Sequence, residues 1–217
     1  MKLGSSPFLK LLVLAVVMSP LVSKADLMTT LGNNPQPNEQ NVLFNTTQNG
    51  NTVNGVTNIS NTMVSFASST DTLGANANGQ AVLTSGNPND PLLNQVSISI
   101  PGGTFNDIIL NPQIPGPNSG ISGPFDLTIT LNTTTGVYTY SFPLSGKNTL
   151  GNGNNFVTFF ATDGTMINSV DLTSTSGIDN LTQVRLSGVV TSTPEPASLL
   201  LLGFGLTAVP FLRRRRV

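Results

Sequence analysis

The 217-residue sequence contains no cysteine, histidine or tryptophan, and charged residues make up only 9% of it. Without cysteine the chain can form no disulfide, no thiolate metal site and no cysteine nucleophile. Without histidine it can hold neither a Ser-His-Asp triad nor the usual zinc sites. The protein must therefore be stabilised by its hydrophobic core, and any catalysis would have to use carboxylates.

Positive charge is scarce outside the two ends of the chain. Between residues 26 and 193 only Lys147 and Arg185 are basic, against nine acidic residues, so this body has a net charge of −7 while the whole chain has −1. A site for the nucleic-acid backbone needs clustered lysine and arginine. The body is therefore not a nucleic-acid-binding domain, and we expect Arg185 to form an ion pair with one of the acidic residues.

Residues 1–25 have the pattern of a secretory signal peptide. Two lysines accompany an apolar stretch at residues 11–18, and small residues precede a cleavage site between Ala25 and Asp26. The alternative, a retained membrane anchor, is disfavoured because about eight apolar residues fall well short of the ~20 that span a bilayer. We therefore predict a signal helix whose partners are the Sec translocon and signal peptidase.

The body predicts an all-β fold. Residues 95–100 and 125–131 alternate apolar and polar side chains, which is typical of strands with one buried face, and no part of the body has a helical period. The run 108–110 is apolar throughout, which indicates a strand covered on both faces or a strand end. We predict an irregular leader at residues 26–40, with room for a short first strand near its start, and one antiparallel, jelly-roll-like β-sandwich at residues 41–191.

Asparagine-glycine and aspartate-glycine pairs predict the tight turns of this fold, because these residues tolerate positive φ. Two loops rich in proline, glycine or asparagine are expected at residues 111–124 and 146–155. The expected turns are at Asn49-Gly50, Asn54-Gly55 and Asp163-Gly164, the last of them in a hairpin between strands at residues 156–161 and 165–172.

Three aromatic residues, Tyr138, Tyr140 and Phe142, share one face of a predicted strand. An exposed tyrosine stripe would offer stacking surfaces for sugar rings, so Tyr138 and Tyr140 are the candidate carbohydrate-binding residues. Packing in the core is the more common explanation of such a stripe. The lack of tryptophan weakens the binding hypothesis further.

No catalytic residue, cofactor or metal site is predicted. Glycoside hydrolysis needs two carboxylates about 5–9.5 Å apart, and the aspartates of the body form no recognisable catalytic pattern. Asp163 is explained as a turn residue before Gly164. Calcium ligands could come from Asn152, Asn154 and Asn155, but the sequence has no Asp-x-Asp-x-Asp-Gly loop.

The tail at residues 192–217 combines a short polar signal, an apolar stretch and a basic cluster. Residues 197–212 would form a helix of about 24 Å, which is short for a hydrocarbon core of about 30 Å. A plain membrane anchor is one explanation of this pattern. The basic cluster is expected on the cytoplasmic side of the membrane by the positive-inside rule. It consists of Arg213, Arg214, Arg215 and Arg216.

The order of Pro194-Glu195-Pro196, a glycine-containing apolar stretch and an arginine cluster resembles a PEP-CTERM sorting domain. The resemblance implies that an exosortase, a membrane-embedded cysteine protease or transpeptidase of Gram-negative bacteria, recognises Pro194, Glu195 and Pro196. The two prolines keep the segment extended, as a protease subsite requires. Residues 105–112 and 183–188 are similar to the β-rich bodies of some PEP-CTERM proteins, which supports the fold and implies no activity.

Together these features predict an exported, non-enzymatic protein of the cell surface or extracellular matrix. It would pass through an inner-membrane-anchored intermediate, held transiently by its C-terminal helix, before the exosortase processes the tail. The alternative is a carbohydrate-binding module for exopolysaccharide, which is often produced alongside PEP-CTERM proteins. A carboxylate-dependent, glycan-active enzyme is the third hypothesis.

Overall fold

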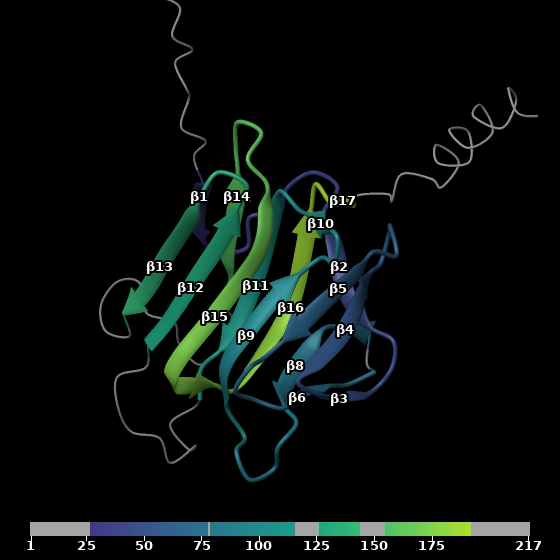
Figure 1. The fold of residues 1–217 in the computed structure, drawn as a ribbon, viewed down its shortest axis with the longest axis vertical. Helices are drawn as coiled ribbons and strands as arrows, with labels where there is room; N and C mark the ends of the chain where they lie inside the picture. The colour runs from purple at the N-terminus through teal and green to yellow at the C-terminus, as the bar shows by residue number, and fades with distance from the viewer. Residues whose placement is uncertain (1–26, 78, 116–125, 144–154, 192–217) are drawn as a thin grey trace, which may run out of the picture.

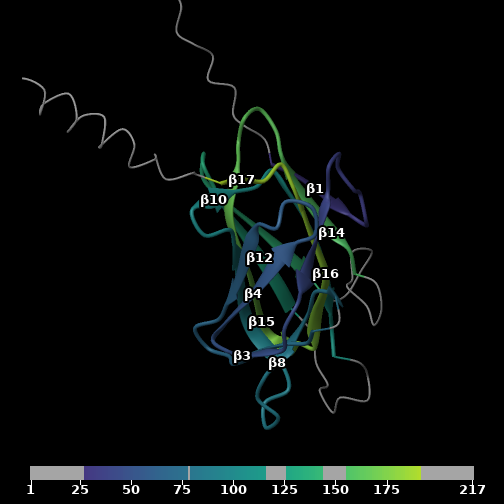
Figure 2. The same ribbon diagram turned by 90° about the vertical axis from the view of Figure 1, so that its right-hand side faces the viewer.

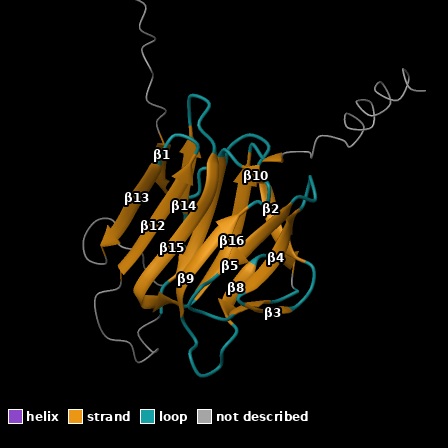
Figure 3. Cartoon of the chain, viewed as in Figure 1, coloured by secondary structure: helices purple, strands orange, loops and turns teal. Residues whose placement is uncertain are grey.

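The computed structural model describes residues 27–77, 79–115, 126–143 and 155–191, and the regular elements in these ranges are all strands (Figure 3). The all-β prediction is therefore confirmed for this part of the chain. None of the described residues forms a helix that could cross a membrane. The predicted signal helix and C-terminal membrane helix lie outside the described ranges.

The strands are short and follow one another closely along the chain (Figure 1). The first half contains β1 (Leu27–Leu31), β2 (Gln40–Phe44), β3 (Gln48–Gly50), β4 (Thr52–Thr57), β5 (Met63–Ala67), β6 (Leu73–Ala75), β7 (Gly79–Gln80), β8 (Val82–Ser85) and β9 (Leu93–Ser99). The second half contains β10 (Gly103–Thr104), β11 (Asp107–Gln113), β12 (Asp126–Thr133), β13 (Val137–Pro143), β14 (Val157–Ala161), β15 (Ile167–Ile178), β16 (Asn180–Ser187) and β17 (Val190–Thr191).

One continuous antiparallel sheet contains nearly all of these strands, in the order β1-β14-β11-β16-β2-β4-β5-β9-β15-β12-β13. The sheet folds back on itself at β2, whose first residues, Gln40 and Asn41, pair with β16 while Val42 and Leu43 pair with β4. Two facing layers result (Figure 2). We call β1, β14, β11 and β16 layer 1, and β4, β5, β9, β15, β12 and β13 layer 2.

The two ends of the folded sheet, β1 and β13, meet at one side of the molecule. The hydroxyl of Tyr140 on β13 donates a hydrogen bond to the backbone carbonyl of Leu27 on β1 (3.4 Å). The ring of Tyr140 also packs against Phe159 on β14, with ring centroids 5.1 Å apart. Side chains thus close the seam that the backbone leaves open, and the sheet is nearly a barrel.

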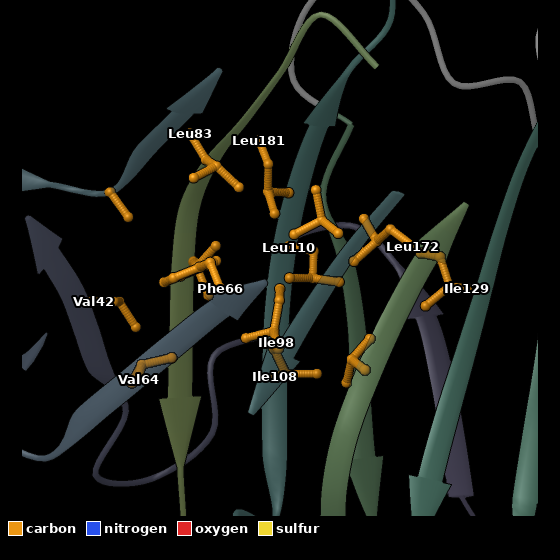
Figure 4. Close-up of a cluster of buried hydrophobic side chains, with 14 of the residues drawn as sticks. Val42, Val64, Phe66, Leu83, Ile98, Ile108, Leu110, Ile129, Leu172 and Leu181 are labelled. Carbon is orange, nitrogen blue, oxygen red and sulfur yellow. The ribbon is translucent and has the colours of Figure 1, made fainter. Parts of the chain in front are cut away.

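The space between the layers is filled by alternate side chains of both (Figure 4). On β9, Val96 and Ile98 point inward and are fully buried, as their alternation predicts. Across the core, Leu110 of layer 1 and Ile129 and Leu172 of layer 2 belong to the same buried cluster. Burial of this apolar surface is the main term that stabilises a protein without disulfides.

Two of the predicted turns are wrong. Asn49-Gly50 lies in β3, and Asn54-Gly55 lies inside β4. Gly55 is buried, and a Cβ atom there would meet Cγ1 of Val42 at 2.6 Å, so this glycine allows β2 and β4 to approach closely. The chain turns instead after β4, where Asn61 has a φ of 54°.

The third pair, Asp163-Gly164, does form a tight turn, with φ values of 53° and 80°. However, the predicted hairpin is wrong, because β14 pairs with β1 and β11 while β15 pairs with β12 and β9. The turn therefore carries the chain from layer 1 to layer 2. A tight turn reverses the chain direction but does not determine that the two strands hydrogen-bond to each other.

The leader is more ordered than the sequence suggests. Its start forms β1, and residues 32–39, which we call the strap, then cross the outer face of layer 1 to reach β2. The strap explains the apolar run on β11. Ile108 and Leu110 face the core, whereas Ile109, also fully buried, lies on the opposite face beside Thr158. The strand is therefore covered on both faces, which confirms one of the two interpretations that the apolar run allowed; the other was a strand end.

Candidate functional site

The strap is fastened to the outer face of layer 1 by hydrogen bonds to β14. The hydroxyl of Thr158 donates to the carbonyl of Gly32 (2.8 Å) and accepts from the backbone N–H of Asn34 (3.2 Å). Two prolines in the strap have no N–H to donate to a ladder. The segment therefore runs over the sheet and does not extend it.

An ion pair fastens the other end of the strap. Nη1 of Arg185 on β16 lies 3.1 Å from Oε1 of Glu39 and also donates to Oδ1 of Asn33 (3.3 Å). The guanidinium carbon is 5.8 Å from the centroid of the Phe156 ring. The side chains of Arg185 and Glu39 are only 20% and 10% exposed. The ion pair that the sequence predicts for Arg185 is confirmed.

Asp107 lies on the same outer face, at the start of β11. It is fully buried, and neither of its carboxylate oxygens has a hydrogen-bond partner in the described part of the chain. Burial, with a smaller contribution from the negative charge of Glu39, raises the pKa of Asp107 to about 7. No sequence pattern predicts the burial of Asp107, because in sequence it is simply a polar residue before an apolar run.

Asp107 and Glu39 do not form a catalytic pair that substrate could reach. Glycoside hydrolysis requires two carboxylates on either side of a bound sugar bond. Here Asp107 has no exposed surface, and Glu39 is engaged by Arg185 and by the backbone N–H of Gln36 (3.2 Å). Neither carboxylate lines the pocket beside the strap or the one beside β10. Glu39 instead ties the strap to the sheet through Arg185.

A pocket of about 460 Å³ opens between the strap and the adjoining ends of β11 and β16. Two of its lining residues have left-handed backbone conformations, Asn38 (φ 62°) and Gly188 (φ 58°). A Cβ atom on Gly188 would lie 2.5 Å from Cβ of Asn106, so only glycine fits there. The lining residues are Gln36, Pro37, Asn38, Gln40, Asn106, Ser187, Gly188 and Val189.

The candidate tyrosines face the inside of the molecule. Tyr138 and Tyr140 are half-buried, and Phe142 beyond them is 7% exposed. Tyr140 packs against the core and against Phe159, and its hydroxyl is bonded to Leu27. The packing explanation of the aromatic stripe therefore applies to Tyr140, and the three residues do not form an exposed platform.

The outer face of layer 2 is flat and rich in hydroxyl groups. Thr139, Thr130, Asp171 and Ser97 lie side by side across four strands, each opposite the next. Thr130 and Thr139 are linked through their hydroxyls (3.3 Å). Asp171 is a charged member of this face and accepts a hydrogen bond from the Asn132 amide (2.8 Å), and the exposed Asp126 lies at the edge of the same face at the start of β12. We call this surface the hydroxyl face; it comprises Thr128, Thr130, Asn132, Thr139, Ser141, Asp171, Thr173, Ser169, Gln95, Ser97, Ser99 and Ser65.

Asp71 has a structural role between two loops. Its carboxylate accepts hydrogen bonds from the side chain and backbone of Asn94, the backbone N–H of Gln95 and the hydroxyls of Ser68 and Thr70. Burial raises the pKa of Asp71, but these hydrogen bonds together outweigh burial and lower it below its usual value. A carboxylate saturated in this way is not a general acid.

Asp126 at the start of β12 is held in a similar manner. Its Oδ1 accepts from the backbone N–H and hydroxyl groups of both Thr175 and Ser176. Burial raises the pKa of Asp126, but the hydrogen bonds from Thr175 and Ser176 together outweigh burial and lower it below its usual value. No group of three acidic residues suited to a metal ion is found in the described ranges. Asn155 is buried and bonded to Asn111 and Pro112, while Asn152 and Asn154 lie outside those ranges.

The remaining predicted site residues belong to the two ends of the chain. A family model for the PEP-CTERM protein-sorting motif matches residues 192–216. The chain carries a PEP-CTERM sorting motif. It is accordingly an exported protein sorted through an exosortase, with a membrane-anchored intermediate before release. No curated protein and no solved structure matches the chain.

The PEP-CTERM match contains both parts of the predicted signal, the Pro194-Glu195-Pro196 tripeptide and the arginines Arg213–Arg216. These residues, together with the predicted signal cleavage site at Ala25 and Asp26, lie outside the described ranges. The β-domain that the motif accompanies ends, in the described structure, at β17. Sorting and the folded domain are therefore separate along the sequence.

Proposed function

We propose that this PEP-CTERM protein is a non-enzymatic component of the cell surface or extracellular matrix. The sorting motif at residues 192–216 is the observation that carries the proposal, because exosortase-dependent sorting applies to exported proteins. In the described domain, Asp71, Asp126 and Glu39 are engaged in structural hydrogen bonds or an ion pair, and Asp107 is enclosed. This arrangement supports a domain that is built to persist at the surface.

The proposal includes the order of processing. The Sec translocon and signal peptidase would cut between Ala25 and Asp26, and the exosortase would then recognise Pro194, Glu195 and Pro196. The arginine cluster would hold the tail across the membrane until that step. The delivered domain would be a jelly-roll-like sandwich in a Gram-negative cell, and the two facing layers support that architecture.

Mass spectrometry of the exported protein tests this order. The expected mature chain begins at Asp26 and lacks Val217. Replacing Pro194, Glu195 and Pro196 by alanine should leave the protein in the membrane fraction, with the same β-domain stability. A mature chain that still ends at Val217 would exclude cleavage of the tail, and normal release of the alanine variant would exclude recognition of the tripeptide.

A carbohydrate-binding module for exopolysaccharide is the second candidate, and the hydroxyl face favours it. Neighbouring strands are about 4.8 Å apart, so the side chains of this face form a regular, nearly uncharged grid of hydroxyl and amide groups. Such a grid can exchange hydrogen bonds with a neutral polysaccharide chain lying flat across it. This face, and not the inward-facing tyrosines, would be the contact surface.

Co-sedimentation of the mature protein with the cell's insoluble exopolysaccharide tests the second candidate. Thr173 is exposed at the centre of the hydroxyl face, so Thr173→Glu should reduce the bound fraction severalfold by adding charge. Thr30→Glu, at an exposed position of β1, is the matched control and should bind as the wild type does. Equal binding by wild type and Thr173→Glu would exclude the hydroxyl face, and loss of binding in Tyr138→Ala alone would point back to the tyrosine.

A further inference from the structure

Four carboxamide side chains, those of Gln36, Asn38, Gln40 and Asn106, line the pocket between the strap and layer 1. We infer that this pocket binds a neutral sugar residue. The inference goes beyond the surface role proposed above and does not depend on the hydroxyl face. It is carried by the polarity of the lining, by its lack of charge and by the way the carboxamides are held.

Three of the carboxamides are oriented by hydrogen bonds that use only part of their capacity. Nδ2 of Asn106 donates to the carbonyl of Ala161 (2.8 Å), and Nε2 of Gln36 donates to the carbonyl of Asn34 (3.1 Å). Each of these side chains keeps its oxygen as an acceptor. Oε1 of Gln40 instead accepts from the backbone N–H of Ser60 (2.8 Å), which leaves its NH₂ group as a donor.

The fourth carboxamide, Asn38, has no hydrogen-bond partner among the described residues. It lies at the most constrained point of the strap, between Pro37 and Glu39, with a φ of 62°. A left-handed residue other than glycine is uncommon, and such residues cluster at binding sites. The strap thus holds one free amide at the pocket while Glu39 fixes the adjoining backbone to Arg185.

These groups fit a sugar hydroxyl better than other ligands. A hydroxyl donates one hydrogen bond and accepts others, so a lining with both free acceptors and free donors satisfies it. Pro37 and Val189 add apolar surface for the C–H face of a pyranose ring. The volume, about 460 Å³, lies within the range of about 300–1,000 Å³ that is usual for small-molecule sites.

The lack of positive charge in the pocket excludes sugars with anionic groups. The pocket has no charged lining residue to pair with a uronate or a sulfate. The body that surrounds it carries a net charge of −7, which repels anions. The expected ligand is therefore a neutral hexose or pentose unit, either free or within a glycan chain.

The test uses the mature exported protein on an array of neutral and acidic oligosaccharides, followed by calorimetric titration of the neutral glycans that bind. Asn38→Gly keeps the left-handed backbone and removes only the carboxamide, so it should raise the Kd about tenfold or more. Asn61→Gly is the matched control, because Asn61 is also left-handed (φ 54°) and exposed but lies in the turn after β4, outside the pocket. Its Kd should equal that of the wild type.

Three outcomes would overturn the inference: no neutral glycan bound at millimolar concentration, a preference for acidic glycans, or an unchanged Kd in Asn38→Gly. Binding that is lost in Thr173→Glu but kept in Asn38→Gly would assign the sugar to the hydroxyl face instead. None of these results bears on surface delivery, which the fractionation of the tail variant tests separately.

Discussion

At the scale of single residues, the enclosed carboxyl of Asp107 lowers the stability of the fold when it is ionised. The pKa of Asp107 is raised from an ordinary value of 3.8 to about 7. Between these two pH values the folded chain holds a proton that the unfolded chain has already lost. The stabilisation linked to this proton is complete below about pH 4 and is lost as the pH rises toward 7. The full effect is on the order of 4 kcal/mol.

Asp107→Asn should therefore change how stability depends on pH. The wild type is expected to lose free energy of unfolding between pH 4 and pH 7, whereas the variant should lose much less. Urea denaturation at several pH values measures both curves. Asp163→Asn removes an exposed carboxylate at a left-handed turn and should leave the wild-type slope intact. Parallel curves for wild type and Asp107→Asn would contradict the raised pKa.

At the scale of elements, the strap is held to layer 1 largely by side chains. Its contacts with layer 1 include the hydrogen bonds to Thr158, a backbone hydrogen bond from Gly32 to Phe156, and the contacts of Arg185 with Glu39 and Asn33. Removing one member of a largely buried ion pair leaves the other charge without compensation, which costs more than the pair itself contributes. The strap should therefore loosen before the sheet does.

Glu39→Gln keeps the size of the side chain and removes its charge. We expect a loss of about 2 kcal/mol in the free energy of unfolding, less than in a fully buried pair because Arg185 is partly exposed. Hydrogen exchange should become faster at the amides of Gly32 and Asn34, which donate to Phe156 and Thr158, and stay unchanged on β9. Unchanged exchange at Gly32 would show that the ion pair does not hold the strap.

At the scale of the whole molecule, closure of the folded sheet depends on Tyr140. The bend at β2 joins the layers on one side by backbone, while on the other side the seam between β1 and β13 is bridged by this side chain. Two edge strands that meet without pairing are exposed to fraying and to pairing with other chains. Tyr140 thus closes the barrel-like sheet, because its hydroxyl bonds to β1 and its ring packs against β14.

Tyr140→Phe should cost at most about 1 kcal/mol, because it removes one long hydrogen bond. Tyr140→Ala should cost about 2–3 kcal/mol, because it also removes the contact with Phe159. Thermal unfolding gives both values, and hydrogen exchange should accelerate on β1 and β13 in the alanine variant. Equal losses in Tyr140→Phe and Tyr140→Ala would mean that the hydroxyl, and not the ring, holds the seam.

The sequence by itself determined how the protein is sorted and the class of its fold. The sorting motif could be read directly because a processing enzyme recognises a short linear segment. The strands could be predicted because alternation, as in Val96, Ile98 and Ile100, depends only on the period of the backbone. The ion pair of Arg185 was also foreseeable, since a lone base in an acidic body finds a partner.

Only the tertiary structure decided which strands are neighbours and where a ligand could bind. Gly55 resembles a turn glycine in sequence, but it lies inside β4, where the pairing strand β2 approaches closely. The carboxamides Asn38 and Asn106 come together because the strap crosses a sheet whose strands come from both halves of the chain. Local patterns fix period and turns, whereas burial and pocket geometry arise from contacts between segments far apart in sequence.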